Sequence, residues 1–369
     1  MDLAIKNTGI IKVLIVLASL VIILAGIKTA TNILVPFLLS IFIAIICNPI
    51  VNKAAEYKIP KTVAVIFVIA MFVGIGMSIA GLIGNSLNEL SLKTPEYREQ
   101  LTIQFSGVID KLAENKIFLS KKLIMQYLDP GAAMGFAADM LSGVGSIMAN
   151  LFLIVLTTVF MLFEASSIPA KLHLALKDPD MKMMKIDRFL SSVNQYLAIK
   201  TWVSIATGCL VSLMLWIVGL DFFLLWGVVA FLLNYIPNIG SIIAAVPAVL
   251  LALVQLDPAT ALFIGVGYMT INTVMGNMVE PKFLGKGLGL STLVVFLSLI
   301  FWGWLLGTVG MLLSVPLTMI IKIALESSAE GEWFSVLLGD ESQAEEDLKA
   351  LQAKFEAEQI EETAEQEKV

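Results

Sequence analysis

The fold is decided by one stretch that begins Asn234-Tyr235-Ile236-Pro237-Asn238-Ile239-Gly240 and ends Glu280-Pro281-Lys282-Phe283-Leu284-Gly285-Lys286-Gly287-Leu288-Gly289-Leu290. At both ends, Pro, Gly, Asn or Glu interrupts very apolar sequence. In a bilayer such interruptions are costly, because they break helices whose backbone groups find no water to bond. A carboxylate such as Glu280 also costs on the order of 2.5–3.5 kcal/mol at mid-membrane depth. Irregular, polar backbone persists where protein or a wet cavity surrounds it, so we interpret this stretch as lining a path through a membrane.

The composition indicates a membrane protein. Of the 369 residues, 58% are hydrophobic and 15% are charged, whereas a soluble globular protein carries roughly 25% charged residues. The uncharged windows are Val13–Ile27, Thr29–Asn52, Thr62–Asn88, Met140–Phe163, Thr201–Leu220, Phe222–Leu256, Pro258–Val279 and Gly287–Ile321. Most are close to the ~20 residues that a helix needs to cross ~30 Å of hydrocarbon. The sequence therefore predicts an all-α, polytopic membrane protein with about eight transmembrane helices, some of them broken or re-entrant.

Charge divides the chain further. The net charge is −6, but residues from Glu326 onward include 14 acidic and 3 basic residues, a balance of −11, so the remainder carries +5. The links Asn52–Lys61 and Ala165–Lys200 are basic, and the positive-inside rule places them and both termini in the cytoplasm. We expect four regions: residues 1–88 as an N-terminal three-helix membrane segment, 89–139 as a polar, helical, extracytoplasmic insertion, 140–325 as a C-terminal membrane domain with broken helices, and 326–369 as an acidic cytoplasmic tail.

Two apolar windows are too long for one ordinary span and short for two. Phe222–Leu256 has 35 residues and is interrupted at Pro237–Gly240; Gly287–Ile321 also has 35 and is interrupted between Gly303 and Gly310. Each window fits either two half-length helices that dip in and return, or two shortened, tilted spans. Paired broken segments are the best sequence-level indication of a transport site.

Between these windows lies one full span, Pro258–Val279, which Asp257 should cap at its N-terminus. Thr273, Asn277 and Glu280 follow at i, i+4 and i+7 and should share one helix face, with Asn272 beside it. This polar face could line the path, or it could simply hydrogen-bond across a helix interface.

Local patterns predict further elements. The first two spans should form a hairpin that turns near Lys28–Thr31, and Thr94-Pro95-Glu96 is typical of a helix start. Met183, Ile186, Leu190, Val193 and Leu197 recur at spacings of 3, 4, 3 and 4. They predict an amphipathic helix that leads into the fifth span, with Lys200 at the end of a basic link.

The sequence does not favour an enzyme. A single histidine, His173, leaves little for a metal hydrolase or a catalytic triad. Cys47 and Cys209 lie within apolar windows and are interpreted as small core residues. Gly285-Lys286-Gly287-Leu288-Gly289 lacks the Ser or Thr and the strand–helix setting of a phosphate loop. We therefore expect no cofactor, metal site or nucleic-acid partner.

The sequence resembles the autoinducer-2 exporter family, the PerM-like permeases. The residues that carry the resemblance are Asn234, Ile236, Pro237, Gly240, Glu280, Pro281, Gly285, Gly289 and Leu290, and then Leu293-Val294-Val295-Phe296, Gly303, Gly307, Gly310 and Pro316. The resemblance covers roughly residues 10–325. It implies a permease of the bacterial inner membrane that exports the quorum-sensing furanone autoinducer-2, although some members are described as sodium(lithium)/proton antiporters.

Three functions stay open. The first is an ion-gradient-driven secondary transporter that exports a small polar solute such as autoinducer-2, with Glu280 as the coupling group and Asn234 and Asn277 as neutral ligands. The second is a sodium(lithium)/proton antiporter, and the third is a non-transporting membrane scaffold. The proposed path comprises Asn234, Pro237, Gly240, Asn272, Thr273, Asn277, Glu280, Pro281, Gly303 and Gly307. We expect no buried basic residue in it, and we expect homo-oligomers because amphipathic stripes at 97–112 and 183–197 need cover.

Overall fold

Every element in the described part of the chain is a helix. The computed structural model describes residues 2–114, 150–175, 179–237, 239–284, 289–326 and 331–340, together with residues 348 and 352. The helices are α1 (Asp2–Thr29), α2 (Thr31–Glu56), α3 (Lys61–Glu114), α6 (Leu151–Glu164), α7 (Ile168–Ala175), α8 (Pro179–Val218), α9 (Phe223–Leu233), α10 (Gly240–Gln255), α11 (Pro258–Val274), a π-helical turn (Met275–Val279), α12 (Glu280–Leu284), α13 (Thr292–Leu312), α14 (Ser314–Glu326) and α15 (Glu332–Leu338).

Several helices are long and apolar enough to cross a bilayer. Among the described residues these are Thr31–Glu56, Lys61–Lys93, Leu190–Val218, Pro258–Phe283 and Thr292–Leu312. Shorter apolar helices accompany them, α9 and α10 among them. The prediction of an all-α, polytopic membrane protein with broken helices is confirmed. The helix predicted over Met183–Leu197 is confirmed, since it forms the first half of α8 and continues into the span without a break. Of its apolar residues, Val193 and Leu197 are buried whereas Leu190 is exposed.

The first broken window folds as a helical hairpin. Its two helices, α9 and α10, have 11 and 16 residues, about 17 and 24 Å at 1.5 Å per residue, so neither covers the ~30 Å of a hydrocarbon core. The hairpin returns to the level at which it started, because the side-chain amide of Gln255 accepts a hydrogen bond from Asp221 N (2.9 Å) and donates one to Gly219 O (3.2 Å). Two short helices whose bases meet agree with either of the two predicted alternatives.

A glycine makes the tip of this hairpin possible. A Cβ atom on Gly240 would lie 1.7 Å from the carbonyl oxygen of Leu233, so only glycine permits the return. Ile236 N, in turn, donates to Leu233 O across 2.9 Å. These contacts satisfy backbone groups of a turn placed at membrane depth, as a bilayer requires.

The second broken window also turns back on itself. The kink falls at Gly307, whose φ of 71° and ψ of −152° place it in a region that is essentially restricted to glycine. A Cβ on Gly303 would lie 2.7 Å from Met311 Cγ, and Trp302 Nε1 donates to Thr318 Oγ1 across 3.0 Å. The base is closed by Lys322, whose ammonium donates to Gly289 O.

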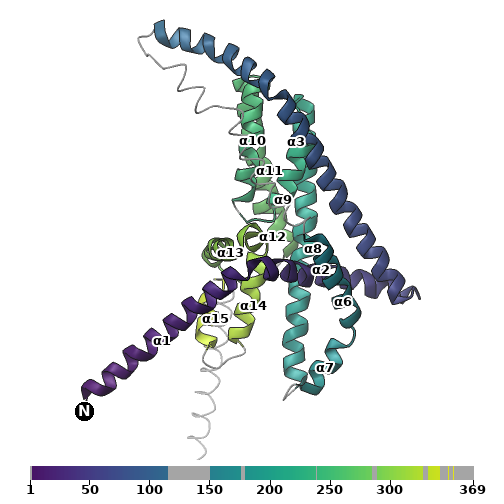
Figure 1. Cartoon of the computed structure of the whole chain (residues 1–369), viewed down its shortest axis with the longest axis vertical. Coiled ribbons are helices and arrows are strands. Elements are labelled where there is room, and N and C mark those ends of the chain that lie inside the picture. The colour runs from purple at the N-terminus through teal and green to yellow at the C-terminus, as the bar shows by residue number, and fades with distance from the viewer. Residues whose placement is uncertain are drawn as a thin grey trace, which may run out of the picture.

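The two hairpins occupy opposite ends of α11. In Figure 1, α9 and α10 lie in the upper half of the molecule and α13, α14 and α15 in the lower half, while α8 passes through both. The base of the first hairpin adjoins Asp257, which caps α11 as predicted by accepting hydrogen bonds from Ala259 N and Thr260 N. The base of the second hairpin follows the other end of α11. The packed core is divided accordingly: one cluster surrounds α9 and α10, and another joins α2, α8, α13 and α14.

Three local predictions are wrong. No helix starts at Thr94-Pro95-Glu96, because helix α3 runs unbroken from Lys61 to Glu114 with Pro95 inside it. Leu90 and Tyr97, on either side of Pro95, are both 2% exposed in the core around the first hairpin. This packing outweighs the backbone hydrogen bond that the proline removes. Helices α1 and α2 do not form a hairpin, since α1 runs away from α2 (Figure 1). Finally, Cys47 is buried but Cys209 is exposed.

Some of the remaining predictions fall on residues that the structure does not describe. Another, the boundary of the acidic tail, differs from the observed structure. Residues 115–139 of the expected polar insertion and the first part of the span expected at Met140–Phe163 lie outside the described residues. Within the expected acidic tail, α15 packs against α14, and Leu338 O accepts a hydrogen bond from Ser291 N (3.1 Å). The folded part of the chain therefore extends past Glu326.

Candidate polar junction in the membrane domain

A buried ion pair joins α8 to the first residue of α12. The ammonium of Lys200 lies 2.9 Å from each carboxylate oxygen of Glu280, and the two side chains are only 5% and 15% exposed. Lys200 lies inside the span Leu190–Val218 and Glu280 inside Pro258–Phe283. Burying two charges is costly, and the bidentate geometry shows how each compensates the other.

The tip of the first hairpin contacts α8 within one turn of Lys200. Asn234 Nδ2 donates to Ser204 Oγ (2.9 Å), and Tyr235 OH donates to Thr201 Oγ1 (2.8 Å). Asn234 is 6% exposed and Ser204 is fully buried. We call the set Lys200, Thr201, Ser204, Asn234, Tyr235 and Glu280 the polar junction.

A π-helical turn precedes Glu280. Residues Met275–Val279 form i→i+5 hydrogen bonds between α11 and α12, a geometry that is rare and is frequently found at functional sites. The turn changes the register of α11, so the side chains expected on one face are separated. Glu280 points to Lys200, whereas Thr273 and Asn277 are exposed.

The position of Lys200 corrects the expectation that no basic residue is buried along the path. Continuing the spacing of Val193 and Leu197 by three and then four residues leads to Lys200 and Ser204. Both therefore lie on the buried face of α8, and this periodicity could have revealed them. The uncharged windows concealed Lys200, because it stands just before one of them and was assigned to the basic link.

The structure brings together only part of the predicted path. Asn234 and Glu280 both belong to the polar junction, and Pro237 and Gly240 form the hairpin tip beside it. Asn272 is partly buried on α11, and Pro281 is exposed. Gly303 and Gly307 shape the second hairpin, where Gly303 is buried and Gly307 is exposed.

The polar junction lies where α8 passes from one hairpin to the other. Val193, Tyr196 and Leu197 pack in the same core cluster as α13 and α14. One turn further along α8, Thr201 and Ser204 contact the tip of the first hairpin. The ion pair therefore lies between the two helical hairpins, and broken helices of this kind form the substrate and ion sites of many secondary transporters.

Chemically, the polar junction offers a carboxylate, an ammonium, two hydroxyls, a phenol and an amide. Such groups can hydrogen-bond a small polar solute, and the carboxylate can exchange its ammonium partner for a proton or a cation. Among the described residues, no group of three His, Cys, Asp or Glu side chains could hold a metal ion.

Comparison with known proteins gives a consistent result. The sequence model of the AI-2E family transporter family matches residues 17–330. The AI-2 transport protein TqsA of Escherichia coli K12 is 44% identical over 330 residues, which cover 89% of this chain and 96% of that protein. A Haemophilus influenzae protein, named provisionally as a transport protein, is 42% identical over 91% of this chain and 98% of its own length.

Proposed function

The chain belongs to the AI-2E transporter family, and from this premise we propose that it is a secondary transporter that exports a small polar solute, such as autoinducer-2, using an ion gradient. The observation that carries the proposal is the Lys200–Glu280 pair beside the tip of the first helical hairpin. In this proposal the protein lies in the bacterial inner membrane as a homo-oligomer, with both termini in the cytoplasm, as the basic links favour.

The cost of the ion pair supports a functional role. Ionisable groups inside membrane spans are rare and typically mark ion pathways or proton relays. An apolar replacement of a buried pair is often neutral or stabilising, so stability alone does not explain why a lysine and a glutamate occupy these positions. A fixed structural pair that specifies how α8 meets α12 is the competing interpretation, and the test below distinguishes the two.

Each residue of the polar junction has a distinct role in the proposal. Glu280 accepts the coupling ion, which weakens its attraction for Lys200 and frees α12 from α8. Asn234, Ser204 and Thr201 hydrogen-bond the solute, because amide and hydroxyl groups can each donate and accept. The hairpin tip moves with the solute, since its polar contacts to α8 are the ones that the solute would replace.

A sodium(lithium)/proton antiporter is the second candidate, and one observation favours it. The Lys200 ammonium occupies the position where an alkali cation would neutralise Glu280, 2.9 Å from both oxygens. Cation binding and retention of the Lys200–Glu280 pair are therefore mutually exclusive. Antiport then follows because the Glu280 carboxylate, once released from Lys200, binds either an alkali cation or a proton and must release the one to take the other.

The test is flux in proteoliposomes containing the purified full-length protein. Labelled autoinducer-2 uptake and internal pH would be followed under imposed proton, Na⁺ and Li⁺ gradients, for the wild type and for Glu280→Gln. Glu164→Gln is the matched control, since Glu164 is paired with Lys171 at the surface. We expect Glu280→Gln alone to lose gradient-dependent flux. Equal flux in all three proteins would exclude Glu280 as the coupling group, and no flux in any would favour a scaffold.

A further inference from the structure

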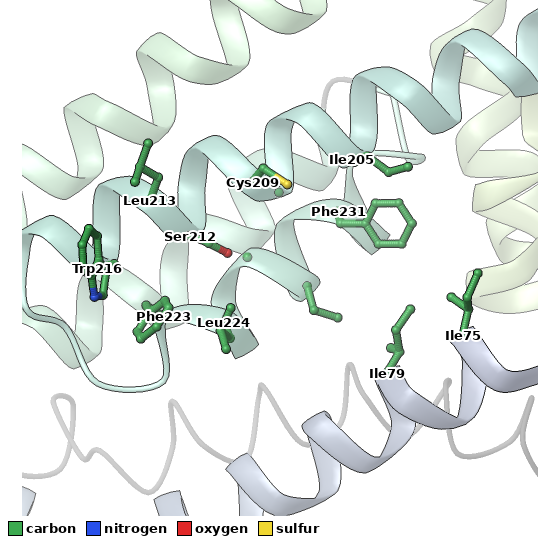
Figure 2. A pocket seen from close by; sticks show the side chains of 13 residues that line it. Ile75, Ile79, Ile205, Cys209, Ser212, Leu213, Trp216, Phe223, Leu224 and Phe231 are labelled. Carbon is green, nitrogen blue, oxygen red and sulfur yellow. The ribbon is translucent and has the colours of Figure 1, made fainter.

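An apolar groove lies on the molecule away from the polar junction. It has a volume of about 540 Å³ and is bounded by α3, α8 and α9. Figure 2 shows Ile75 and Ile79 of α3 facing Cys209 and Leu213 of α8. None of its lining residues belongs to the polar junction, so the groove requires an explanation of its own.

The floor of the groove is formed where α8 and α9 approach most closely. A Cβ on Gly208 would lie 2.8 Å from Gly227 O, and a Cβ on Gly227 would lie 1.7 Å from Ser212 Oγ. Small residues therefore hold the two backbones together and leave the space above them open. The lining side chains of α3 and α8 belong to spans of the bilayer, so this space opens toward hydrocarbon rather than toward water.

One end of the groove reaches the membrane surface. Trp216 and Phe223 lie at that end, with Phe231 at the other (Figure 2). Trp216 is 60% exposed, and tryptophan is enriched at the interface between hydrocarbon and water. Two residues before Phe223 stands Asp221, at the base of the first hairpin.

Charged groups of both signs surround that end. Lys93 and Tyr97 of α3 both donate to Asp221 Oδ2, across 2.7 and 2.8 Å. The Lys93 ammonium also lies 5.5 Å from the centre of the Phe222 ring. Glu89 and Glu96 flank Lys93 on α3 and interact with it electrostatically. Among the side chains described at this end, the balance is therefore one basic group, Lys93, against three acidic groups.

We propose that this groove binds a phospholipid with a zwitterionic ethanolamine headgroup, whose acyl chain lies between α3 and the α8–α9 pair. The apolar lining and its opening toward hydrocarbon select an acyl chain. At the surface end, Lys93 bonds the phosphate and the carboxylates of Asp221, Glu89 and Glu96 attract the ammonium. An anionic headgroup lacks that ammonium and is repelled by the excess of carboxylates, so the site discriminates against phosphatidylglycerol. A bound lipid would brace α3 against the base of the first hairpin.

The experiment is native mass spectrometry of the full-length protein, released from vesicles of equimolar phosphatidylethanolamine, phosphatidylglycerol and phosphatidylcholine. Cys209→Trp fills the groove from an exposed position, and Leu224→Trp does so from α9 should the first variant fold poorly. Leu262→Trp is the matched control, since Leu262 is 69% exposed on α11 and does not line the groove. Lys93→Gln tests the headgroup, with Lys53→Gln as its control.

We expect the wild type and both controls to retain one phosphatidylethanolamine per chain in preference to the other lipids. Filling the groove should abolish that retention, and Lys93→Gln should weaken binding about tenfold, as expected for one charge-assisted hydrogen bond. Equal retention by the groove-filling variants, or retention of phosphatidylglycerol at least as strong, would overturn the proposal. Disulfide-linked dimers through Cys209 in oxidised membranes would also overturn it, because a second copy would then cover the groove. The readout is lipid occupancy, so it is independent of transport.

Discussion

Removing the charge of Glu280 should destabilise the protein, whereas removing both charges of the pair should not. In Glu280→Gln, the Lys200 side chain remains buried, with 5% of it exposed. Its ammonium loses the carboxylate whose two oxygens each lie 2.9 Å from Nζ. An unpaired buried charge is among the costliest changes that a single substitution makes. In Lys200→Met/Glu280→Gln, no charge is left uncompensated.

The magnitude follows from the burial. Breaking a buried ion pair by removing one partner typically costs about 3–5 kcal/mol. Glu280 keeps 15% of its side chain exposed, which allows some hydration, so we expect a value near the lower limit, about 3 kcal/mol. Neutral replacement of both partners is often harmless, so the double variant should unfold within about 1 kcal/mol of the wild type.

The assay is equilibrium unfolding in mixed detergent–SDS micelles, with helix content as the readout. Glu164→Gln, which removes a surface pair, should change stability by less than about 1 kcal/mol. If the single and double variants were equally destabilised, packing rather than the unpaired charge would be responsible. If both were as stable as the wild type, Lys200 and Glu280 would not be paired in the membrane.

Three further substitutions test the hairpins. Gly240→Ala should destabilise the protein by about 1–3 kcal/mol or more in the same unfolding assay, because the new Cβ would clash with the carbonyl oxygen of Leu233. The control is Gly81→Ala, which should be neutral or stabilising because the space at its Cβ is open. Equal effects of the two substitutions would refute the turn geometry. Gly307→Ala should cost about 1–3 kcal/mol from backbone strain, and a neutral result would place the kink elsewhere. Burial raises the pKa of Asp221, but hydrogen bonds with Lys93, Tyr97 and Gln255, together with the positive charge of Lys93, bring that pKa below its ordinary value. The ionised Asp221 carboxylate should therefore stabilise the fold fully above the ordinary carboxyl pKa, and this stabilisation should be lost as pH falls through the lower pKa of the folded state. Asp221→Asn should remove this pH dependence from unfolding curves measured at a series of pH values.

Much of the fold could be predicted because a bilayer makes irregular backbone conspicuous. Pro237 and Gly240 in one apolar window, and Gly307 in the other, indicated the turns of the two hairpins. A helix that is interrupted inside a bilayer leaves backbone groups that other parts of the protein must satisfy, so such an interruption is informative. Asp257 was recognisable as a helix cap for a similarly local reason. In each case the decisive interaction lies within a few residues of the signal.

The rest depended on contacts between distant segments. Glu280 was identifiable as unusual, but its partner lies 80 residues earlier in the chain. The π-helical turn removed Thr273 and Asn277 from its face, and a single sequence gives no signal for one extra residue in a turn. Likewise, Pro95 indicated a helix start, but α3 continues past it because Leu90 and Tyr97 pack in the core. Tertiary packing overrode local preference in each case.

The central claim is that the Lys200–Glu280 pair couples transport to an ion gradient. The most direct measurement is gradient-driven flux of autoinducer-2 and protons in proteoliposomes of Lys200→Met/Glu280→Gln, a variant that should retain the stability of the wild type. The account predicts a folded protein without gradient-dependent flux. Wild-type flux with the same dependence on the gradient would contradict it, and would leave the ion pair as a structural contact between α8 and α12.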